Sequence, residues 1–244
     1  MSWWAASVWA GMVPIQGGSY LPLYPPDPEH PEAEVASFQL DTLPTTRGEF
    51  AQFVTEHPEW QRGNVPPILA DERYLKSWVS PTTPDGDPRV PVTEVSWFAA
   101  RAYCEARGAR LPTSDEWEYV ARASPKKKDA TMDDDWLALT LSWYSKPRHS
   151  APSIVGQRPA NAWGVYDMHG LIWEWVEDFN NTIFGTDSRE GGDENNLRFC
   201  GAGALSATDV RDYATFMRIA YRSSLKGKYT TRALGFRCAA DLEK

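Results

Sequence analysis

The stretch Asn161–Asp178 constrains the chain most, because it places three tryptophans, two glycines and four carboxylates within eighteen positions. Gly164 and Gly170 indicate that the backbone turns tightly or closely approaches another segment there. Residues 172–176 alternate with a period of two, which is typical of a strand. Glu174 lies between two tryptophans, where an uncompensated carboxylate costs on the order of several kcal/mol. The pattern predicts that Glu174 is paired with another group, or that it meets Asp167 at a common cation.

Composition indicates one loop-rich domain without an affinity for nucleic acid. The chain has 244 residues with 12 tryptophans and 19 prolines, and neither a linker nor a repeat divides it. Its net charge of −8 opposes binding to a phosphate backbone. No apolar run approaches the roughly 20 residues that a membrane-spanning helix needs. We therefore expect a compact domain of mixed α and β structure without a membrane span.

The first ten residues are apolar and contain no basic side chain. A secretory signal has a charged start followed by an apolar stretch of about 7 to 15 residues. Two interpretations therefore stay open for residues 1–10: the remnant of an export signal, or an ordinary first strand.

Three helices are predicted from their caps. Thr46 and Glu49 have the spacing of a capping box, and so do Thr113 and Glu116. Ser96 is a suitable N-cap for a helix over residues 97–107, which Gly108 would close. We expect irregular structure over residues 59–89 and 142–157, and a solvated insertion at the charge runs 126–128 and 133–135.

Four motifs resemble one known family, the formylglycine-generating enzymes or sulfatase-modifying factors. They are residues 163–170 followed by Trp173-Glu174-Trp175, residues 110–119, residues 235–239 and residues 12–18. The resemblance implies one domain over residues 11–240 with a tail at 241–244. It also implies an α+β variant of the C-type lectin fold, with twisted antiparallel sheets and two packed helices. Residues 197–205 and 219–223 resemble the last core strands of the family.

The resemblance implies a calcium ion bound by the Asp167 and Glu174 side chains and by the Gly170 and Ile172 carbonyls. Such hard oxygen ligands suit calcium, and a glycine turn exposes the carbonyls that it needs. The alternative is that Asp167 caps a turn while Glu174 pairs with a buried arginine.

Cys104 and Cys238 lie where exported relatives have a disulfide. A bridge would close a loop of 134 residues. By restricting the entropy of the unfolded chain, it would stabilise the fold by about 4–5 kcal/mol. A disulfide would agree with a periplasmic or otherwise exported protein. Two buried free thiols would agree with a cytoplasmic one.

Formylglycine-generating enzymes use copper(I) held by two cysteines, and this chain departs from them there. No cysteine occurs between Ser206 and Arg218, and the carboxylates present cannot replace two thiolates for soft copper(I). The resemblance therefore does not extend to cysteine oxidation, and it leaves copper or iron binding open. Cys200 is either a ligand of a soft metal or a small apolar core residue.

The position of the family's active site predicts a candidate ligand groove. Its residues are Trp173, Asp209, Asp212, Tyr213, Arg218 and Arg222. These side chains could bind a peptide, or they could form buried ion pairs that support the loop. The segment also resembles a subgroup linked with bacterial copper nitrite reductases. We expect an exported accessory protein that binds a partner protein or peptide during its maturation. The alternative is a metal-dependent oxidoreductase or oxygenase with different chemistry on the same scaffold.

Overall fold

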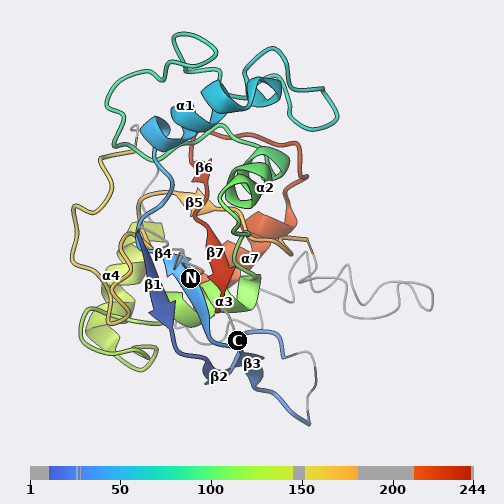
Figure 1. The fold of residues 1–244 in the computed structure, drawn as a ribbon. Coiled ribbons are helices and arrows are strands. Elements are labelled where there is room, and N and C mark those ends of the chain that lie inside the picture. The colour runs from blue at the N-terminus through green and yellow to red at the C-terminus, as the bar shows by residue number, and fades with distance from the viewer. Residues whose placement is uncertain (1–10, 26, 28, 145–151, 181–211, 243–244) are drawn as a thin grey trace, which may run out of the picture.

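The computed structural model is a mixed α+β fold in which short sheets and helices are joined by long irregular segments (Figure 1). It describes residues 11–25, 27, 29–144, 152–180 and 212–242. Helix α1 (Arg47–Glu56) and the segment that follows it lie at one end of the molecule, and α2 (Trp97–Ala106) packs next to α1. None of the helices in these ranges is long and apolar enough to cross a membrane.

The main sheet joins the two ends of the chain. Strand β4 (Phe38–Asp41) pairs antiparallel with β1 (Met12–Ile15) on one side and with β7 (Ala239–Asp241) on the other. A second antiparallel pair consists of β2 (Gly18–Tyr20) and β3 (Ala33–Val35). Ile15, Phe38 and Leu40 are fully buried, so the sheet is held by its apolar face.

The central motif supplies one strand to a third sheet. Strand β5 (Trp173–Glu174) pairs with β6 (Leu234–Gly235) in parallel, whereas the other two sheets are antiparallel, as expected. A Cβ atom at Gly235 would lie 2.2 Å from the Val92 carbonyl oxygen. Only glycine allows the two segments to approach so closely, which explains its place in this strand.

The three helices predicted from caps are present. Helix α1 has both capping-box bonds between Thr46 and Glu49, and α3 (Ser114–Ala121) has those between Thr113 and Glu116. Ser96 caps α2, and Gly108 follows that helix with a φ of 71°. A single 3-10 turn, η1 (Pro58–Trp60), begins the irregular segment after α1.

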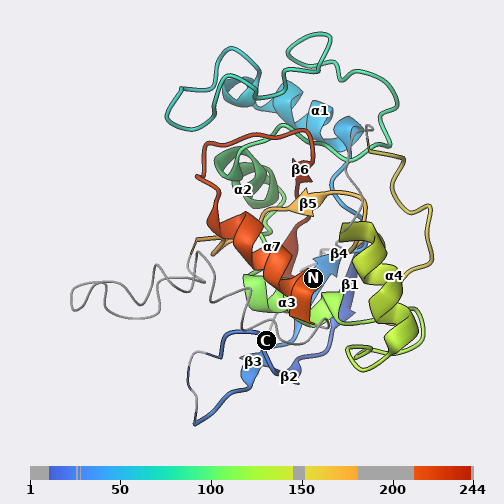
Figure 2. The ribbon, with the colours of Figure 1, turned by 180° about the vertical axis from the view of Figure 1, so that it is seen from behind.

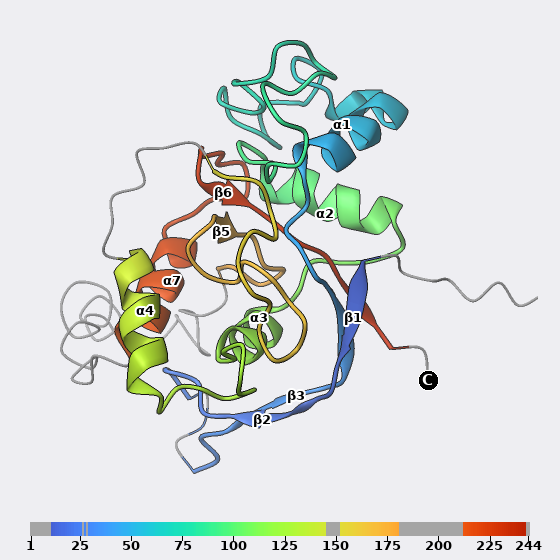
Figure 3. The same cartoon turned by 90° about the vertical axis from the view of Figure 1, so that its left-hand side faces the viewer.

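Two further helices were not predicted. Helix α4 (Asp134–Tyr144) begins in the expected solvated insertion and extends into residues 142–144, which were expected to be irregular. Helix α7 (Tyr213–Ser223) includes residues 219–223, which were expected to be a strand. They lie side by side (Figure 3). Helix α7 buries Ala214, Arg218 and Arg222. Because two of these inward positions carry arginine, a search for apolar periodicity misses the helix.

The core is aromatic and closed by a disulfide. Trp175, Phe38, Phe50 and Phe236 are fully buried. The sulfur atoms of Cys104 on α2 and Cys238 next to β7 are bonded, with their Cα atoms 5.6 Å apart. The disulfide implied by the family resemblance is therefore present.

Candidate ligand-binding site

Glu174 forms a closed ion pair in the core. Its two oxygens accept hydrogen bonds of 2.8 Å from Nε and Nη2 of Arg237, and Nε1 of Trp117 donates a third at 2.8 Å. Arg237 also donates to the carbonyls of Asp41, Thr42 and Tyr166. Both side chains are almost completely buried. Glu174 thus follows the alternative in which it pairs with a buried arginine.

Three of the four groups predicted to bind calcium, those of Asp167, Gly170 and Glu174, accept hydrogen bonds from the protein. Oδ2 of Asp167 accepts from the Gly156 backbone N–H at 2.6 Å. The Gly170 carbonyl accepts from Nη2 of Arg158 at 3.3 Å. Glu174 accepts from Arg237 and the Gly170 carbonyl accepts from Arg158, so two guanidinium groups already supply positive charge to these oxygens. The residues as placed therefore disfavour a calcium ion at these oxygens.

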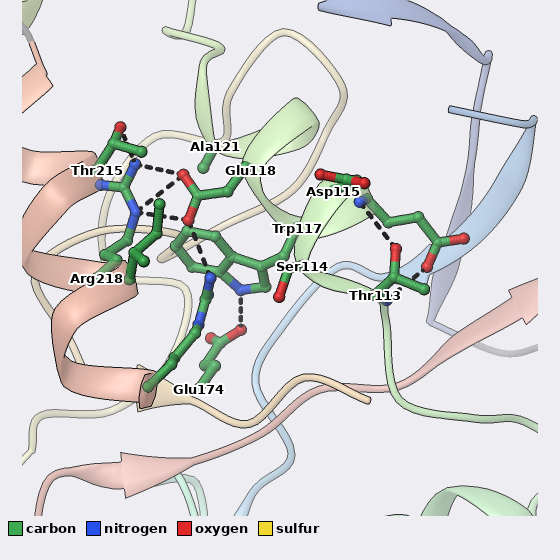
Figure 4. A network of polar contacts seen from close by, with 12 residues as sticks. Thr113, Ser114, Asp115, Trp117, Glu118, Ala121, Glu174, Thr215 and Arg218 are labelled. Carbon is green, nitrogen blue, oxygen red and sulfur yellow. Dashed lines mark hydrogen bonds and ion pairs between the residues drawn. The ribbon is translucent and has the colours of Figure 1, made fainter. Parts of the chain in front are cut away.

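A second buried cluster joins α3 to α7 (Figure 4). Glu118 on α3 accepts from Nε of Arg218 at 2.9 Å and from Nη2 at 2.6 Å, and from Nη1 of Arg222 at 3.0 Å. All three side chains are less than 10% exposed. Burial alone would raise the pKa of Glu118, but the Arg218 and Arg222 guanidinium groups hold it below its usual value. One carboxylate thus pairs with two buried arginines.

The cluster continues through Tyr144 of α4 to His169. Nη1 of Arg218 donates to the Tyr144 hydroxyl at 3.2 Å, and that hydroxyl lies 3.2 Å from Nδ1 of His169. Nε2 of His169 lies 2.8 Å from the Ala121 carbonyl, which can only accept, so this nitrogen carries the proton. Burial and the Arg218 charge lower the pKa of His169 to about 3. The imidazole is therefore neutral and fixed in one tautomer.

A cavity of about 300 Å³ opens over this cluster. It is walled by one face each of α3, α4 and α7 and by the segment after β2; Figure 2 shows α7 toward the viewer, with α4 beside it. Its apolar lining consists of Tyr20, Leu21, Pro22, Leu23, Tyr24, Ala121, Ala130, Met132, Trp136, Leu137 and Ile219. The polar lining consists of Ser114, Asp115, Glu118, Arg122, Thr131, Thr140, Asp212, Thr215, Arg218 and Arg222. The wall is apolar over most of its area, which together with polar groups that converge on one part of it is typical of a small-ligand site.

Unpartnered polar atoms collect at this cavity. Six buried side-chain nitrogen or oxygen atoms within the described ranges have no hydrogen-bond partner. Three belong to lining residues: the hydroxyls of Ser114 and Thr140, and Nε of Arg122. Thr140 as a whole is only 6% exposed. A buried polar group without a partner costs about 1–3 kcal/mol, so such a concentration calls for an explanation.

The predicted groove residues do not form one exposed surface. Arg218 and Arg222 are buried, and the carboxylate partner of Arg218 is Glu118. Trp173 stacks on Tyr221 with ring centroids 4.5 Å apart and does not line the cavity. Tyr213 is 45% exposed. Asp212 lines the cavity beside Arg218 and Arg222. Asp209 and Cys200 lie outside the described residues.

Sequence reasoning missed Glu118, Thr140 and Tyr144. Glu118 carried a usable signal, because it shares one face of α3 with Ser114 and Ala121, four residues before it and three after it. A carboxylate on the inward face of a helix needs a buried partner. Thr140 and Tyr144 belong to α4, which was not expected.

Comparison with known proteins gives the class of this protein. The family model described as Sulfatase-modifying factor enzyme 1-like domain matches residues 5–242. The chain belongs to this family, and the resemblance of its four motifs is confirmed.

Catalytic and inactive relatives both occur among the similar proteins. The inactive C-alpha-formylglycine-generating enzyme 2 of Bos taurus is 30% identical over 183 residues, which cover 59% of this chain and 61% of that protein. The chain thus matches about three fifths of that relative's length. Formylglycine-generating enzyme of Bos taurus is 28% identical over 282 residues, covering 94% of this chain and 74% of that protein. The structure of PvdO from Pseudomonas aeruginosa has a TM-score of 0.51 at 21% identity, over 95% of this chain and 94% of that one; it supports the fold alone.

Proposed function

We propose that this protein is a non-catalytic accessory member of its family, which binds a segment of a partner protein during the partner's maturation in an exported compartment. The observation that carries the proposal is the cysteine inventory. The chain has three cysteines, and Cys104 and Cys238 are bonded to each other. Cys200 alone remains, so one chain cannot supply the two thiolates of a copper(I) site.

The cavity between α3, α4 and α7 gives the proposal a binding site. It combines an apolar wall with polar atoms that have no partner among the described residues. The disulfide favours an oxidising compartment. The partner would be an exported protein, with a copper redox enzyme as the candidate that the sequence suggests.

Three measurements test this function. Incubation with a sulfatase-type cysteine peptide, copper(I), oxygen and reductant is expected to yield no aldehyde by mass spectrometry. Cross-linking in the native host is expected to identify one exported partner. Elemental analysis of the purified protein is expected to find no stoichiometric copper or iron. Aldehyde formation, or a stoichiometric redox metal together with oxygen consumption, would favour the oxidoreductase alternative instead.

A further inference from the structure

We infer that the cavity over Glu118, Arg218 and Arg222 binds a carboxylate that is attached to an apolar body, as in an acidic residue or a chain terminus flanked by leucine-like side chains. This inference rests on the proposed function and names the chemistry of the segment bound. Three independent features of the cavity carry it: unused donors in its buried part, an unequal charge there, and the apolar wall above.

The first feature is the hydrogen-bonding state of Arg222. Its guanidinium has five N–H groups. Within the described part of the chain, it makes one hydrogen bond, from Nη1 to Glu118. Arg218, in contrast, uses Nε, Nη1 and Nη2 on Glu118, Tyr144 and Thr215. Arg222 is 4% exposed and lines the cavity; on this inference, the ligand in the cavity supplies acceptors for its other N–H groups.

The second feature is the local charge. Three acidic and three basic residues line the cavity, so it is not cationic as a whole. The acids Asp115 and Asp212 lie at its more exposed rim, and Asp115 accepts a hydrogen bond from the Tyr20 hydroxyl at 2.7 Å. In the buried part, Glu118 is the one lining carboxylate among the described residues that pairs with the two guanidinium groups. One incoming carboxylate would equalise the charge there.

The hydroxyl of Thr140 adds a further donor. It is buried without a partner although Thr140 lies in a helix, where a threonine hydroxyl commonly bonds the carbonyl four residues earlier. A bound acceptor would satisfy it. Donors that are left unpaired in the free protein strengthen discrimination between ligands, because only a ligand with matching acceptors forms hydrogen bonds with them.

The apolar wall fixes the rest of the ligand. Leu21, Leu23, Met132, Trp136, Leu137 and Ile219 line the cavity. Its volume of about 300 Å³ is at the lower end of the range for ligand pockets. A single carboxylate with one or two aliphatic side chains matches both the volume and the wall.

Defined peptides test the inference by calorimetry. The probes are acetyl-Leu-Glu-Leu-amide, its glutamine twin acetyl-Leu-Gln-Leu-amide, and acetyl-Leu-Gln-Leu with a free terminal carboxylate. We expect saturable binding of one or both carboxylate probes with a Kd of about 1 mM or below, and at least tenfold weaker binding of the glutamine twin (about 1.4 kcal/mol). The two carboxylate probes separate a side chain from a chain terminus. Equal binding of all three, or no saturable carboxylate binding, would overturn the inference.

Matched variants distinguish this site from adventitious binding. Thr140→Val is expected to weaken carboxylate binding about three- to tenfold while leaving the melting temperature unchanged or higher. Thr45→Val is the control, because Thr45 also has a buried unpartnered hydroxyl but does not line the cavity. Arg222→Met is expected to bind the glutamic acid and glutamine peptides equally. If Thr140→Val and Arg222→Met both retain wild-type preference, the carboxylate binds elsewhere and the inference is wrong. The partner found by cross-linking would stand independently of that result.

Discussion

Two buried glutamates in this fold are compensated in opposite ways. Glu174 faces one guanidinium, Arg237, whose remaining donors bond three backbone carbonyls. Glu118 faces two, and Arg222 uses one donor on it. Trp117 lies between the two sites: its indole N–H donates to Glu174, while the Arg222 guanidinium lies 4.5 Å from its ring centroid (Figure 4). In the first pair the two opposite charges balance, and Nε, Nη1 and Nη2 of Arg237 all donate to protein acceptors. The second has an excess cation and a cavity.

This difference separates a structural ion pair from a candidate binding site. A buried pair with every hydrogen bond made holds segments together, and breaking it leaves an uncompensated charge. A buried cluster with one charge and several donors in excess is costly in the free protein. Such a cluster is better tolerated where a bound ligand neutralises the excess charge and pairs the free donors.

The largest effect is expected from Arg237→Met. Glu174 would lose its cation inside the core, which costs about 3–5 kcal/mol of unfolding free energy. Chemical denaturation followed by tryptophan fluorescence measures it. A loss below about 1 kcal/mol would contradict the closed-pair description of Glu174.

Arg218→Ala comes next. It removes three hydrogen bonds from Glu118 and one from Tyr144, so we expect a loss of about 2–4 kcal/mol. Tyr213→Ala is the control on the same helix. Because Tyr213 is 45% exposed, its loss should stay within about 0.5 kcal/mol. Similar melting temperatures for the two variants would mean that Arg218, like Tyr213, belongs to an exposed ligand surface.

The pH dependence of stability should isolate His169. Its pKa in the folded protein is about 3, below the 6.5 of a free histidine, so the unfolded chain binds the extra proton. Stability is then complete above about pH 6.5 and falls as the pH drops toward 3, by up to about 1.4 kcal/mol per pH unit. Urea unfolding between pH 7 and 5, with EDTA present, measures the slope. His169→Gln should flatten it.

Arg222→Met should change stability least among the arginine variants, by within about 1 kcal/mol. It removes a buried cation whose pKa is lowered by burial and by Arg218 despite Glu118, and Glu118 keeps three hydrogen bonds from Arg218. Denaturation beside Arg237→Met tests the comparison directly. Equal losses in the two variants would show that both clusters are structural.

The sequence predicted what depends on local chemistry and on the family motifs. Caps at Thr46, Ser96 and Thr113 fixed three helices because each satisfies backbone N–H groups within one turn. Helix α7 escaped prediction because its inward face carries Arg218 and Arg222, and α4 because its first turn lies within the charge run 133–135. The cavity itself depends on four segments distant in sequence, so no local pattern reports it.

Calcium removal is expected to have the smallest effect, and it tests the Glu174 side of the comparison. The resemblance implies an ion at Asp167, Gly170, Ile172 and Glu174, but Arg237 and Arg158 donate to two of these groups. An ion present at 100 times its Kd would stabilise the fold by about 2.7 kcal/mol, which corresponds to roughly 5–10 °C in a chain of this size. Since guanidinium groups already supply the positive charge, we expect chelation with EGTA to shift the melting temperature by less than about 1 °C. A shift of several degrees that calcium reverses and magnesium does not would mean that Glu174 shares its oxygens between Arg237 and the ion. The two buried clusters would then differ in what they bind, a metal at Glu174 and a ligand carboxylate at Arg222, rather than in whether they bind anything.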